Sequence, residues 1–167
     1  MKNQYNTPFR VAINVDGVHH DVRIEAPVDT TAYENGDVLF ASVIAIPDVA
    51  RSSGRNVRLD SVIGAEDGGQ APSMTLLFFH VLPSQTGAAN AAVAWAGNHA
   101  RKFAGKINIV AADWETLGSK SFLTLGGMQT DLTVTGTDLY MVAVCKSAYD
   151  AVAVGDLSLT LNFNREA

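Results

Sequence analysis

Charged side chains are scarce in this sequence. They make up 17% of its 167 residues, against about 25% in an average soluble domain. The net charge of −5 argues against a protein that binds nucleic acid through a basic surface. Proline is low, with 5 residues, and glycine is near average, with 14. Disordered tails, collagen-like rods and coiled coils need other compositions. We therefore expect one compact domain, since this length leaves little room for a second hydrophobic core.

The sequence contains one cysteine, Cys145. No intrachain disulfide can form, which excludes a disulfide scaffold, and a zinc site with four cysteines is impossible. Cys145 ends the apolar run 139–145, which is typical of a buried strand. Because free cysteine is among the most buried residue types, we interpret Cys145 as a structural thiol rather than a nucleophile.

Long hydrophobic segments are also missing. The most apolar run, residues 38–46, is about half of the roughly 20 residues that span a bilayer as a helix. The N-terminus is polar and lacks the apolar stretch of a signal peptide. We expect a protein that is made and used without crossing a membrane, with neither membrane nor nucleic acid among its partners.

Alternation of apolar and polar residues is the dominant pattern in the chain. It covers residues 11–15, 22–25, 56–60 and 157–164. The last segment is the most regular, with leucine and phenylalanine on one face and small polar residues on the other. Strands with one buried and one wet face are typical of antiparallel sheets.

Other segments are apolar at nearly every position. They are residues 38–46, 74–82 and 139–145, with 107–112 as a shorter version. Such runs predict central strands that are covered on both faces by a second sheet, a neighbouring subunit or a loop.

Turn residues separate these segments. Asp16-Gly17 predicts a tight hairpin between the first two strands, and Asn35-Gly36-Asp37 precedes a strand expected to begin at Val38. The alanine-rich segment 88–102 predicts a long connection with a short helix, and residues 113–118 predict a second helical turn.

Together these patterns predict an all-β fold. We expect an antiparallel β-sandwich or jelly roll of about ten strands with one or two short helical turns. Residues 10–167 are assigned to a single β-sandwich domain, and residues 1–9 to a flexible N-terminal arm. The sequence shows no internal repeat and no linker that would divide the domain.

The histidines do not form a recognisable metal motif. His19 and His20 are adjacent, so in a strand they point to opposite faces and cannot share one site. His80 lies in an apolar strand and is interpreted as a core or interface residue with one hydrogen bond, and His99 is expected to be exposed. The His-x-His pair with a following glutamate that marks cupin metal sites is absent. We predict no metal site.

Residues for catalysis are equally hard to assemble. Gly-x-Ser-x-Gly and phosphate-binding loops are absent. Five aspartates neighbour a glycine or open a strand, where turn and capping chemistry favours them; they are Asp16, Asp37, Asp67, Asp138 and Asp156. A paired-carboxylate site is therefore less well supported than turn roles. We predict no catalytic residues, no cofactor and no enzymatic activity.

Two groups of residues point weakly to binding. The first is a small basic cluster, interpreted as a solvated loop rather than a contact for an acidic partner: Arg51, Arg55 and Arg58. The second is a set of aromatic residues that could form a sugar-binding platform, although their scatter favours burial or interface packing: Tyr33, Trp95, Trp114, Tyr140 and Tyr149.

Residues 27–38, with the sequence Pro-Val-Asp-Thr-Thr-Ala-Tyr-Glu-Asn-Gly-Asp-Val, resemble a signature of small structural proteins of tailed phages. Further blocks of this pattern follow in the expected order within about residues 20–163. They are residues 58–62, residues 76–79 with Pro83-Ser84 and 90–92, and residues 139–142. The chain thus resembles the jelly-roll decoration (cement) proteins of tailed-phage capsids.

This resemblance implies a structural protein of the virion. Decoration proteins of this family sit on the outer capsid surface, often as homotrimers. They bind the major capsid protein and stabilise the shell, and they are made in the host cytoplasm. The family brings no catalytic, cofactor or metal residues, and the partner-binding residues stay unassigned. Tyr33, Gly36 and Asp37 look like turn-forming and packing residues. The family's glycine-rich turn is reduced here to Ser52-Ser53-Gly54.

Two other functions stay open at this point. One is a tail, fibre or collar component of the same kind of virion. The other is a carbohydrate-binding jelly-roll module for attachment to host sugars, which an exposed row of aromatic residues on one face would support. Low charge and small outward residues suit close packing between subunits.

Overall fold

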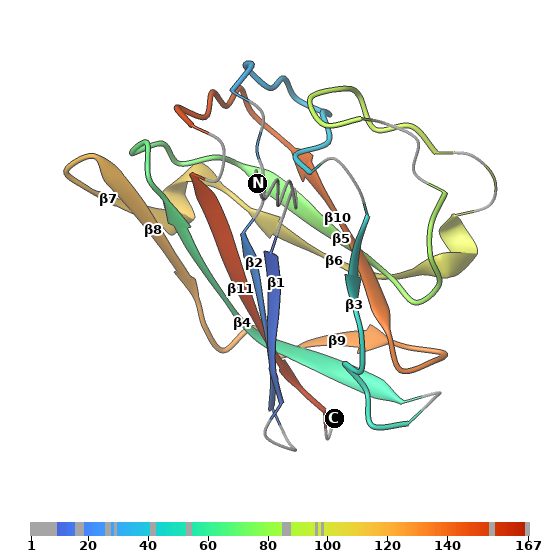
Figure 1. Cartoon of the computed structure of the whole chain (residues 1–167). Coiled ribbons are helices and arrows are strands. Elements are labelled where there is room, and N and C mark those ends of the chain that lie inside the picture. Colours follow the sequence, from blue (N-terminus) through green and yellow to red (C-terminus); the bar gives the residue numbers. More distant parts are fainter. Residues whose placement is uncertain are drawn as a thin grey trace, which may run out of the picture.

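The computed structural model describes residues 10–15, 19–25, 28, 30–40, 43–52, 55–84, 88–95, 97, 99–153 and 156–165. Within these residues the secondary structure is β-strands and two single 3₁₀ turns, as Figure 1 shows. The all-β class expected from the sequence is therefore confirmed. The elements are β1 (Arg10–Val15), β2 (His19–Glu25), β3 (Ile44–Ile46), β4 (Asn56–Glu66), β5 (Met74–Phe79), η1 (Ala100–Lys102), β6 (Phe103–Ile109), η2 (Ala111–Asp113), β7 (Trp114–Leu117), β8 (Lys120–Leu125), β9 (Thr130–Thr133), β10 (Leu139–Cys145) and β11 (Leu157–Asn164).

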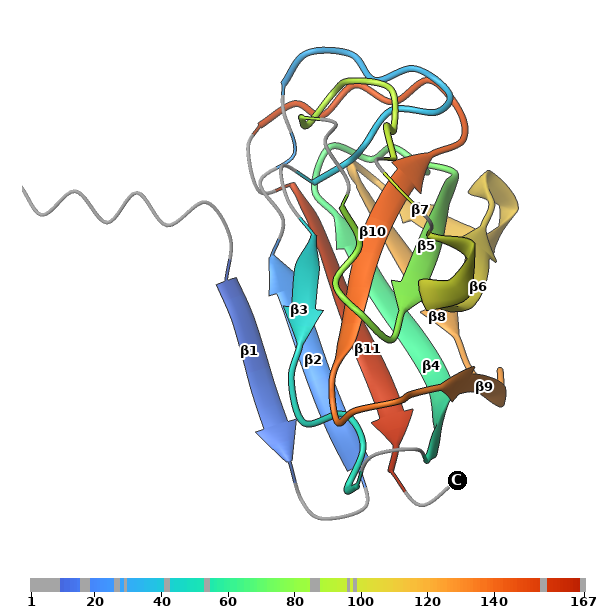
Figure 2. The same ribbon diagram turned by 90° about the vertical axis from the view of Figure 1, so that its right-hand side faces the viewer.

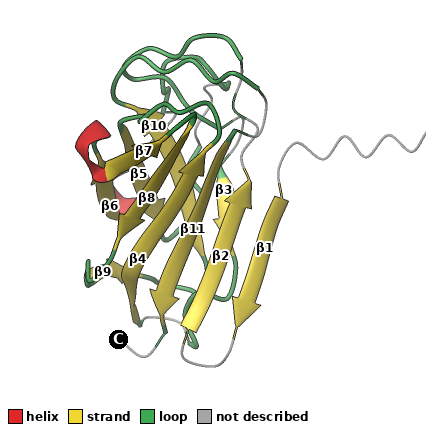
Figure 3. Ribbon diagram, turned by 90° about the vertical axis from the view of Figure 1, so that its left-hand side faces the viewer, coloured by secondary structure: helices red, strands yellow, loops and turns green. Residues whose placement is uncertain are grey.

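The strands form two antiparallel sheets that pack as a sandwich. The first has seven strands in the order β1-β2-β11-β4-β8-β7, with β9 also paired to β4, and Figure 3 shows it from outside. The second has four strands in the order β3-β10-β5-β6, which face the viewer in Figure 2.

The path of the chain is that of a jelly roll. Strands β2 to β5 alternate between the two sheets, and β9, β10 and β11 alternate again. Thus β2-β11-β4-β8 faces β3-β10-β5-β6, the double-sheet arrangement of jelly rolls. Strands β8 and β9 follow one another along β4, since Leu125 pairs with Val62 and Thr130 with Leu59.

The core lies between the inner faces of the sheets, where the alternating pattern placed it. In β11 every second residue is buried and its neighbours are partly exposed, as predicted. Strand β2 follows the same rule, with Val22 and Ile24 buried. The outward residues of β11 are small and polar: Ser158, Thr160, Asn162 and Asn164.

Strands β5 and β10 are apolar on both faces because a connection of the same chain covers their outer side. A second hydrophobic cluster forms there from Val38, Phe79, Val142 and Val144, with Val93 packed against it. Val93 belongs to the connection between β5 and β6. Of the three kinds of cover predicted from the sequence, a loop is the one found in this part of the molecule.

The prediction of one strand over residues 38–46 is wrong for most of that run. Within the described parts of this run, 38–40 and 43–46, only Ile44–Ile46 is a strand, and Val38 forms an isolated bridge with Val144. The Val38 N–H donates to Ala91 O, at 2.9 Å, and the next N–H along donates to β10. Because the backbone divides its hydrogen bonds between two different segments, no ladder forms, although the side chains are buried.

Two other strand boundaries differ from the prediction. The run 74–82 ends as a strand at Phe79, and Val81 and Leu82 are exposed. The strand predicted over 107–112 is shifted toward the N-terminus: β6 starts at Phe103 and stops at Ile109.

The two helical turns are found near their predicted places. Turn η1 lies inside the predicted connection 88–102, as expected. The turn predicted over 113–118 is wrong in position, because η2 precedes it and Trp114–Leu117 is a strand. The Asp113 carboxylate accepts from Val110 N at 2.8 Å and closes the turn early. The arm 1–9 and the Asp16-Gly17 turn lie outside the described residues.

Candidate functional site

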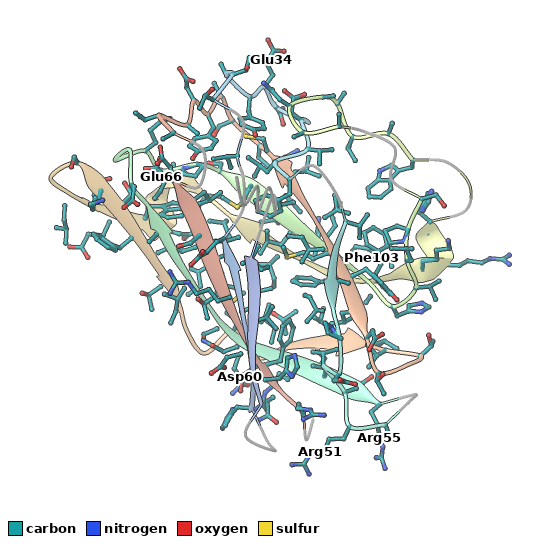
Figure 4. The ribbon with its side chains drawn as sticks, in the orientation of Figure 1. Glu34, Arg51, Arg55, Asp60, Glu66 and Phe103 are labelled. Carbon is teal, nitrogen blue, oxygen red and sulfur yellow. The ribbon has the colours of Figure 1, made fainter. Side chains whose placement is uncertain are left out.

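Residues 30–38, the continuous described part of the segment compared with the phage signature, lie at one end of the sandwich, where Figure 4 labels Glu34. Tyr33 is fully buried and stacks on Tyr149, with ring centroids 5.8 Å apart, and their backbones form a bridge. Gly36 has φ +102 and donates to Cys145 O at 2.8 Å. The Asp37 carboxylate accepts from Glu34 N at 2.8 Å. These residues form turns and pack, as the sequence predicted, so this part of the signature is a scaffold.

A buried carboxylate supports the same end of the molecule. Glu66 is fully buried and accepts from Gln70 N at 2.6 Å, and the Tyr149 hydroxyl lies 3.4 Å from its Oε1. Burial raises the pKa of Glu66, and it also raises the pKa of Tyr149. The pair links the turn after β4 to the Tyr33–Tyr149 stack. Nothing in the local sequence marked Glu66 as buried, since it directly precedes a polar turn.

The histidines are separated, as expected. His19 is exposed, and His20 points into the core. His80 has two polar contacts rather than the predicted one: its Nδ1 lies 3.0 Å from Thr135 Oγ1, and its Nε2 3.0 Å from Arg101 O. His99 is partly buried against Trp95, not fully exposed. Within the described residues, no three histidine, cysteine, aspartate or glutamate side chains are grouped to hold a metal ion.

The charged residues singled out in the sequence mostly have local roles. Arg58, one of the three residues of the predicted basic cluster, forms an ion pair with Asp60, with Nε 2.6 Å from Oδ1. Arg51 and Arg55 are exposed at the end of the sandwich opposite Glu34, as Figure 4 shows. The carboxylates of four of the five turn aspartates accept hydrogen bonds within the described chain, three from backbone N–H groups and one from Lys120: Asp37, Asp138, Asp156 and Asp67. Asp16 lies outside it.

Cys145 is buried at the end of β10, as predicted. Its thiol donates to Ser147 O at 2.9 Å, and burial raises its pKa. A thiol in this setting is a poor nucleophile, because the thiolate form is disfavoured.

A hollow lined by aromatic rings lies on the outer face of the four-stranded sheet. We call it the aromatic groove. It has a volume of about 210 Å³, and its lining is Leu77, Phe79, Trp95, His99, Ala100 and Phe103. The Phe79 ring centroid lies 5.3 Å from that of Trp95 and 5.9 Å from that of Phe103. Figure 4 shows Phe103 at the side of the molecule that carries η1.

The aromatic residues singled out in the sequence divide into buried and exposed ones. Tyr33, Trp114 and Tyr149 are buried and Tyr140 is partly buried, whereas Trp95 is 37% exposed. Phe103, which the sequence interpretation did not include, is 42% exposed. Strand register brings Phe103 beside Phe79, and the connection between the two strands places Trp95 over them. The residues come from three separate segments, so no local motif could reveal the groove.

A second group of exposed apolar residues lies on the outer face of the other sheet. We call it the Phe122 patch. It consists of Ile63 on β4, Leu117 on β7 and Phe122 on β8, which are 46%, 59% and 43% exposed. Phe122 pairs with Glu115 on one side and with Ala65 on the other, so it lies diagonally between Leu117 and Ile63. Small polar residues of β11 continue this face.

The comparisons with known proteins add little. No family model and no curated protein matches the sequence. Among solved structures, the capsular polysaccharide assembling protein CapF from Staphylococcus aureus aligns with 87% of this chain at 12% identity, with a TM-score of 0.17. The chain spans 33% of that protein, and a TM-score this low carries no argument. Within the described residues, no helix is long and apolar enough to span a bilayer.

Proposed function

We propose that this protein is a structural component of a tailed-phage virion, a decoration protein that binds the outer capsid surface and stabilises the shell. The observation that carries the proposal is the position of the two exposed apolar regions. The aromatic groove lies on the outer face of one sheet and the Phe122 patch on the outer face of the other. Exposed groups of large apolar side chains mark sites of protein association.

Apolar regions on both faces of a sandwich allow one subunit to contact two neighbours at once. A cement protein needs this arrangement, because it holds adjacent subunits of a shell together through several contacts of moderate strength. We assign the Phe122 patch, with its small neighbouring residues, to contact between copies of the chain in a homotrimer. The aromatic groove is assigned to contact with the major capsid protein. The similarity of residues 27–38 to the phage signature supports the same role.

The proposal is tested by adding purified protein to undecorated capsids of the phage that encodes it. We expect hundreds of copies per shell after sedimentation, and greater resistance of the decorated shell to heat. Trp95→Ser is expected to weaken shell binding, whereas Val152→Ser, a control at a 71% exposed residue outside both regions, is expected to bind normally. If no copies remain on the shell and heat resistance is unchanged, the decoration role is wrong.

Copy number separates this role from the nearest alternative. A tail, fibre or collar component would be present in a few or a few dozen copies per virion. Quantitative mass spectrometry of purified virions measures this number directly.

A second candidate function is binding of host carbohydrate. The exposed ring of Trp95, with His99 beside it at a centroid distance of 5.1 Å, is a surface on which a sugar ring can stack. A glycan array tests this function. Hits that are lost in Trp95→Ser would favour it, and an array without hits would count against it.

A further inference from the structure

The outer face of β5 and β6 carries more than the aromatic groove. A second hollow, of about 390 Å³, follows it along the same two strands, and its lining is Ser73, Met74, Thr75, Lys106, Asn108, Ile109, Val110 and Lys146. Lys106 pairs with Leu77, a lining residue of the aromatic groove, so the two hollows meet at this pair. We call the combined surface the β5–β6 track.

The two halves of the β5–β6 track differ in chemistry. In the aromatic groove, the imidazole of His99 and the indole N–H of Trp95 are the hydrogen-bonding side-chain groups among the described lining residues. The second half combines apolar lining residues with polar ones, and Lys106 and Lys146 are among the polar ones. Arg101 adds a third exposed cation two residues before Phe103. Among the described residues, Arg101, Lys106 and Lys146 form no ion pair. A basic surface of this kind contrasts with the net charge of −5 of the chain.

The size and lining of the aromatic groove indicate what it holds. Its volume of about 210 Å³ is below the roughly 300–1,000 Å³ of small-molecule pockets. It is suited to one bulky side chain, and aromatic pockets of this kind are typical energetic centres of protein interfaces. A sugar would need several converging hydrogen-bonding groups, and the lining side chains offer two, the imidazole of His99 and the indole N–H of Trp95. A protein side chain therefore fits the groove better than a sugar ring.

The spacing of the β5–β6 track matches an extended chain. Outward residues along a strand repeat every second position, about 6.6–6.8 Å apart. On β5, one such step leads from Phe79 to Leu77 and the next to Thr75. The β6 partners of these residues are Phe103, Lys106 and Asn108, with one extra residue between the first two at the register shift, and Lys146 lines the same hollow as the last pair. A partner segment in extended conformation has the same repeat. Its side chains at every second position would meet the groove first and the two lysines afterwards.

We propose that the β5–β6 track binds an extended, acidic protein segment that places one bulky apolar side chain in the aromatic groove. Carboxylates two, four and six residues along the segment from that side chain lie on the same face as it does, and they meet Lys106 and Lys146. This inference rests on the proposed function only in naming the capsid protein as the source of the segment. The chemistry of recognition holds for any protein partner, and the test below uses no capsid.

Two peptides of identical composition test the proposal. The first is acetyl-Phe-Ser-Asp-Ser-Asp-Ser-Asp-amide, in which the carboxylates share the face of the phenylalanine when the chain is extended. The second is acetyl-Phe-Asp-Ser-Asp-Ser-Asp-Ser-amide, in which they point to the opposite face. We expect the second to bind about tenfold more weakly, the effect of losing roughly one charge-assisted contact. Calorimetry gives the affinities, and the fluorescence of Trp95 reports occupation of the groove.

Variants identify the residues responsible. Lys106→Glu and Trp95→Ser are each expected to weaken binding of the first peptide about tenfold. Arg55→Glu and Val152→Ser, which alter exposed residues away from the β5–β6 track, are expected to bind normally. Lys106→Met keeps the apolar stem and removes the charge, so it replaces Lys106→Glu if that variant unfolds at a lower temperature than the wild type.

Three outcomes would overturn the proposal. The first is equal binding of the two peptides, which would show attraction by charge alone. The second is failure of both to bind at millimolar concentration. The third is binding of an acidic polysaccharide such as polygalacturonate, lost in Trp95→Ser, without binding of the first peptide, which would assign the track to carbohydrate. If this protein binds the first peptide selectively but does not attach to capsids, peptide binding by the β5–β6 track is supported. Only the proposed virion role is then contradicted.

Discussion

At the scale of single residues, His20 stands out because an ionisable ring lies in the apolar core. The alternation of β2 turns it inward together with Val22 and Ile24, and it is fully buried. Among the described residues, neither ring nitrogen has a hydrogen-bond partner. Burial lowers the pKa of His20 below 6.5, and the charge of Arg165 adds to this, while Asp48 and Asp21 act in the opposite direction. The fold therefore favours the neutral ring.

The consequence for stability follows from proton linkage. In the unfolded chain the ring takes up a proton near pH 6.5, whereas in the folded protein it does so only at lower pH. The part of the folding stability that depends on a neutral His20 is thus fully present above about pH 6.5. It is lost as the pH falls toward the lowered pKa of His20 in the folded state. Replacing His20 with leucine removes this titration and two unsatisfied polar atoms.

We expect His20→Leu to be more stable than the wild type by about 1–2 kcal/mol near pH 7.5, and by more as the pH falls to 5.5. Urea unfolding at several pH values measures this. Comparing the two proteins cancels the effect of Glu66, whose raised pKa acts in the opposite direction. His19→Gln, at the exposed neighbour, is the control and should keep the pH dependence of the wild type. A parallel loss of stability in His20→Leu and wild type would contradict the assignment.

At the scale of elements, β4 shows how closely neighbouring strands and loops approach one another. Gly64 is buried, and a Cβ at this position would lie 3.1 Å from Trp114 Cη2, 3.2 Å from Leu123 Cβ and 3.2 Å from Leu159 Cδ2. Those atoms come from three different strands. The absence of a side chain at Gly64 therefore sets the distance at which β7, β8 and β11 pack around the long central strand.

Gly64→Ala is expected to destabilise the fold by about 1–3 kcal/mol, because an added methyl group overpacks the core. Gly126 offers a matched control, since a Cβ there would have no atom within 4 Å. Gly126→Ala should therefore change the free energy of unfolding by less than about 0.5 kcal/mol. Chemical denaturation of both variants measures the difference, and equal effects would show that crowding at Gly64 is relieved by small shifts of its neighbours.

The elements also show what could be predicted from the sequence and what could not. Alternating segments such as 157–164 have one physical interpretation, so their strands and buried faces were predicted correctly. The run 38–46 was not, because a buried loop and a buried strand carry the same apolar side chains. The aromatic groove depends on pairing between Phe79 and Phe103 across a register shift, which no local pattern encodes. The burial of Glu66 was missed because this residue directly precedes a polar turn, where carboxylates are usually exposed.

At the scale of the whole molecule, the outer face of the seven-stranded sheet is well suited to self-association. The Phe122 patch is bordered by Ala65, Ser158 and Thr160, whose short side chains allow a second surface to approach closely. Burying exposed leucine, isoleucine and phenylalanine side chains supplies about 25 cal/mol for each Å² removed from water.

The trimer assignment predicts a particle of three chains, each of 17.7 kDa, in analytical ultracentrifugation. Phe122→Ser should shift the population toward monomers, because the central apolar residue of the patch is lost. Phe103→Ser, which alters an apolar residue of similar exposure on the other sheet, should leave the mass unchanged. A monomeric wild type, or equal dissociation by both variants, would remove the Phe122 patch from the trimer contact.

The position of β11 has a consequence for how the chain is made. It is the last strand described, yet it lies between β2 and β4 and joins them into one sheet. A ribosome therefore releases β2 and β4 long before the strand that holds them side by side exists. Until residues 157–164 emerge, both strands keep open edges of the kind that pair with other chains. Completion of the fold must then wait until residues 157–164 have been synthesised, and nascent chains packed closely on one messenger are most exposed to aggregation just before that point.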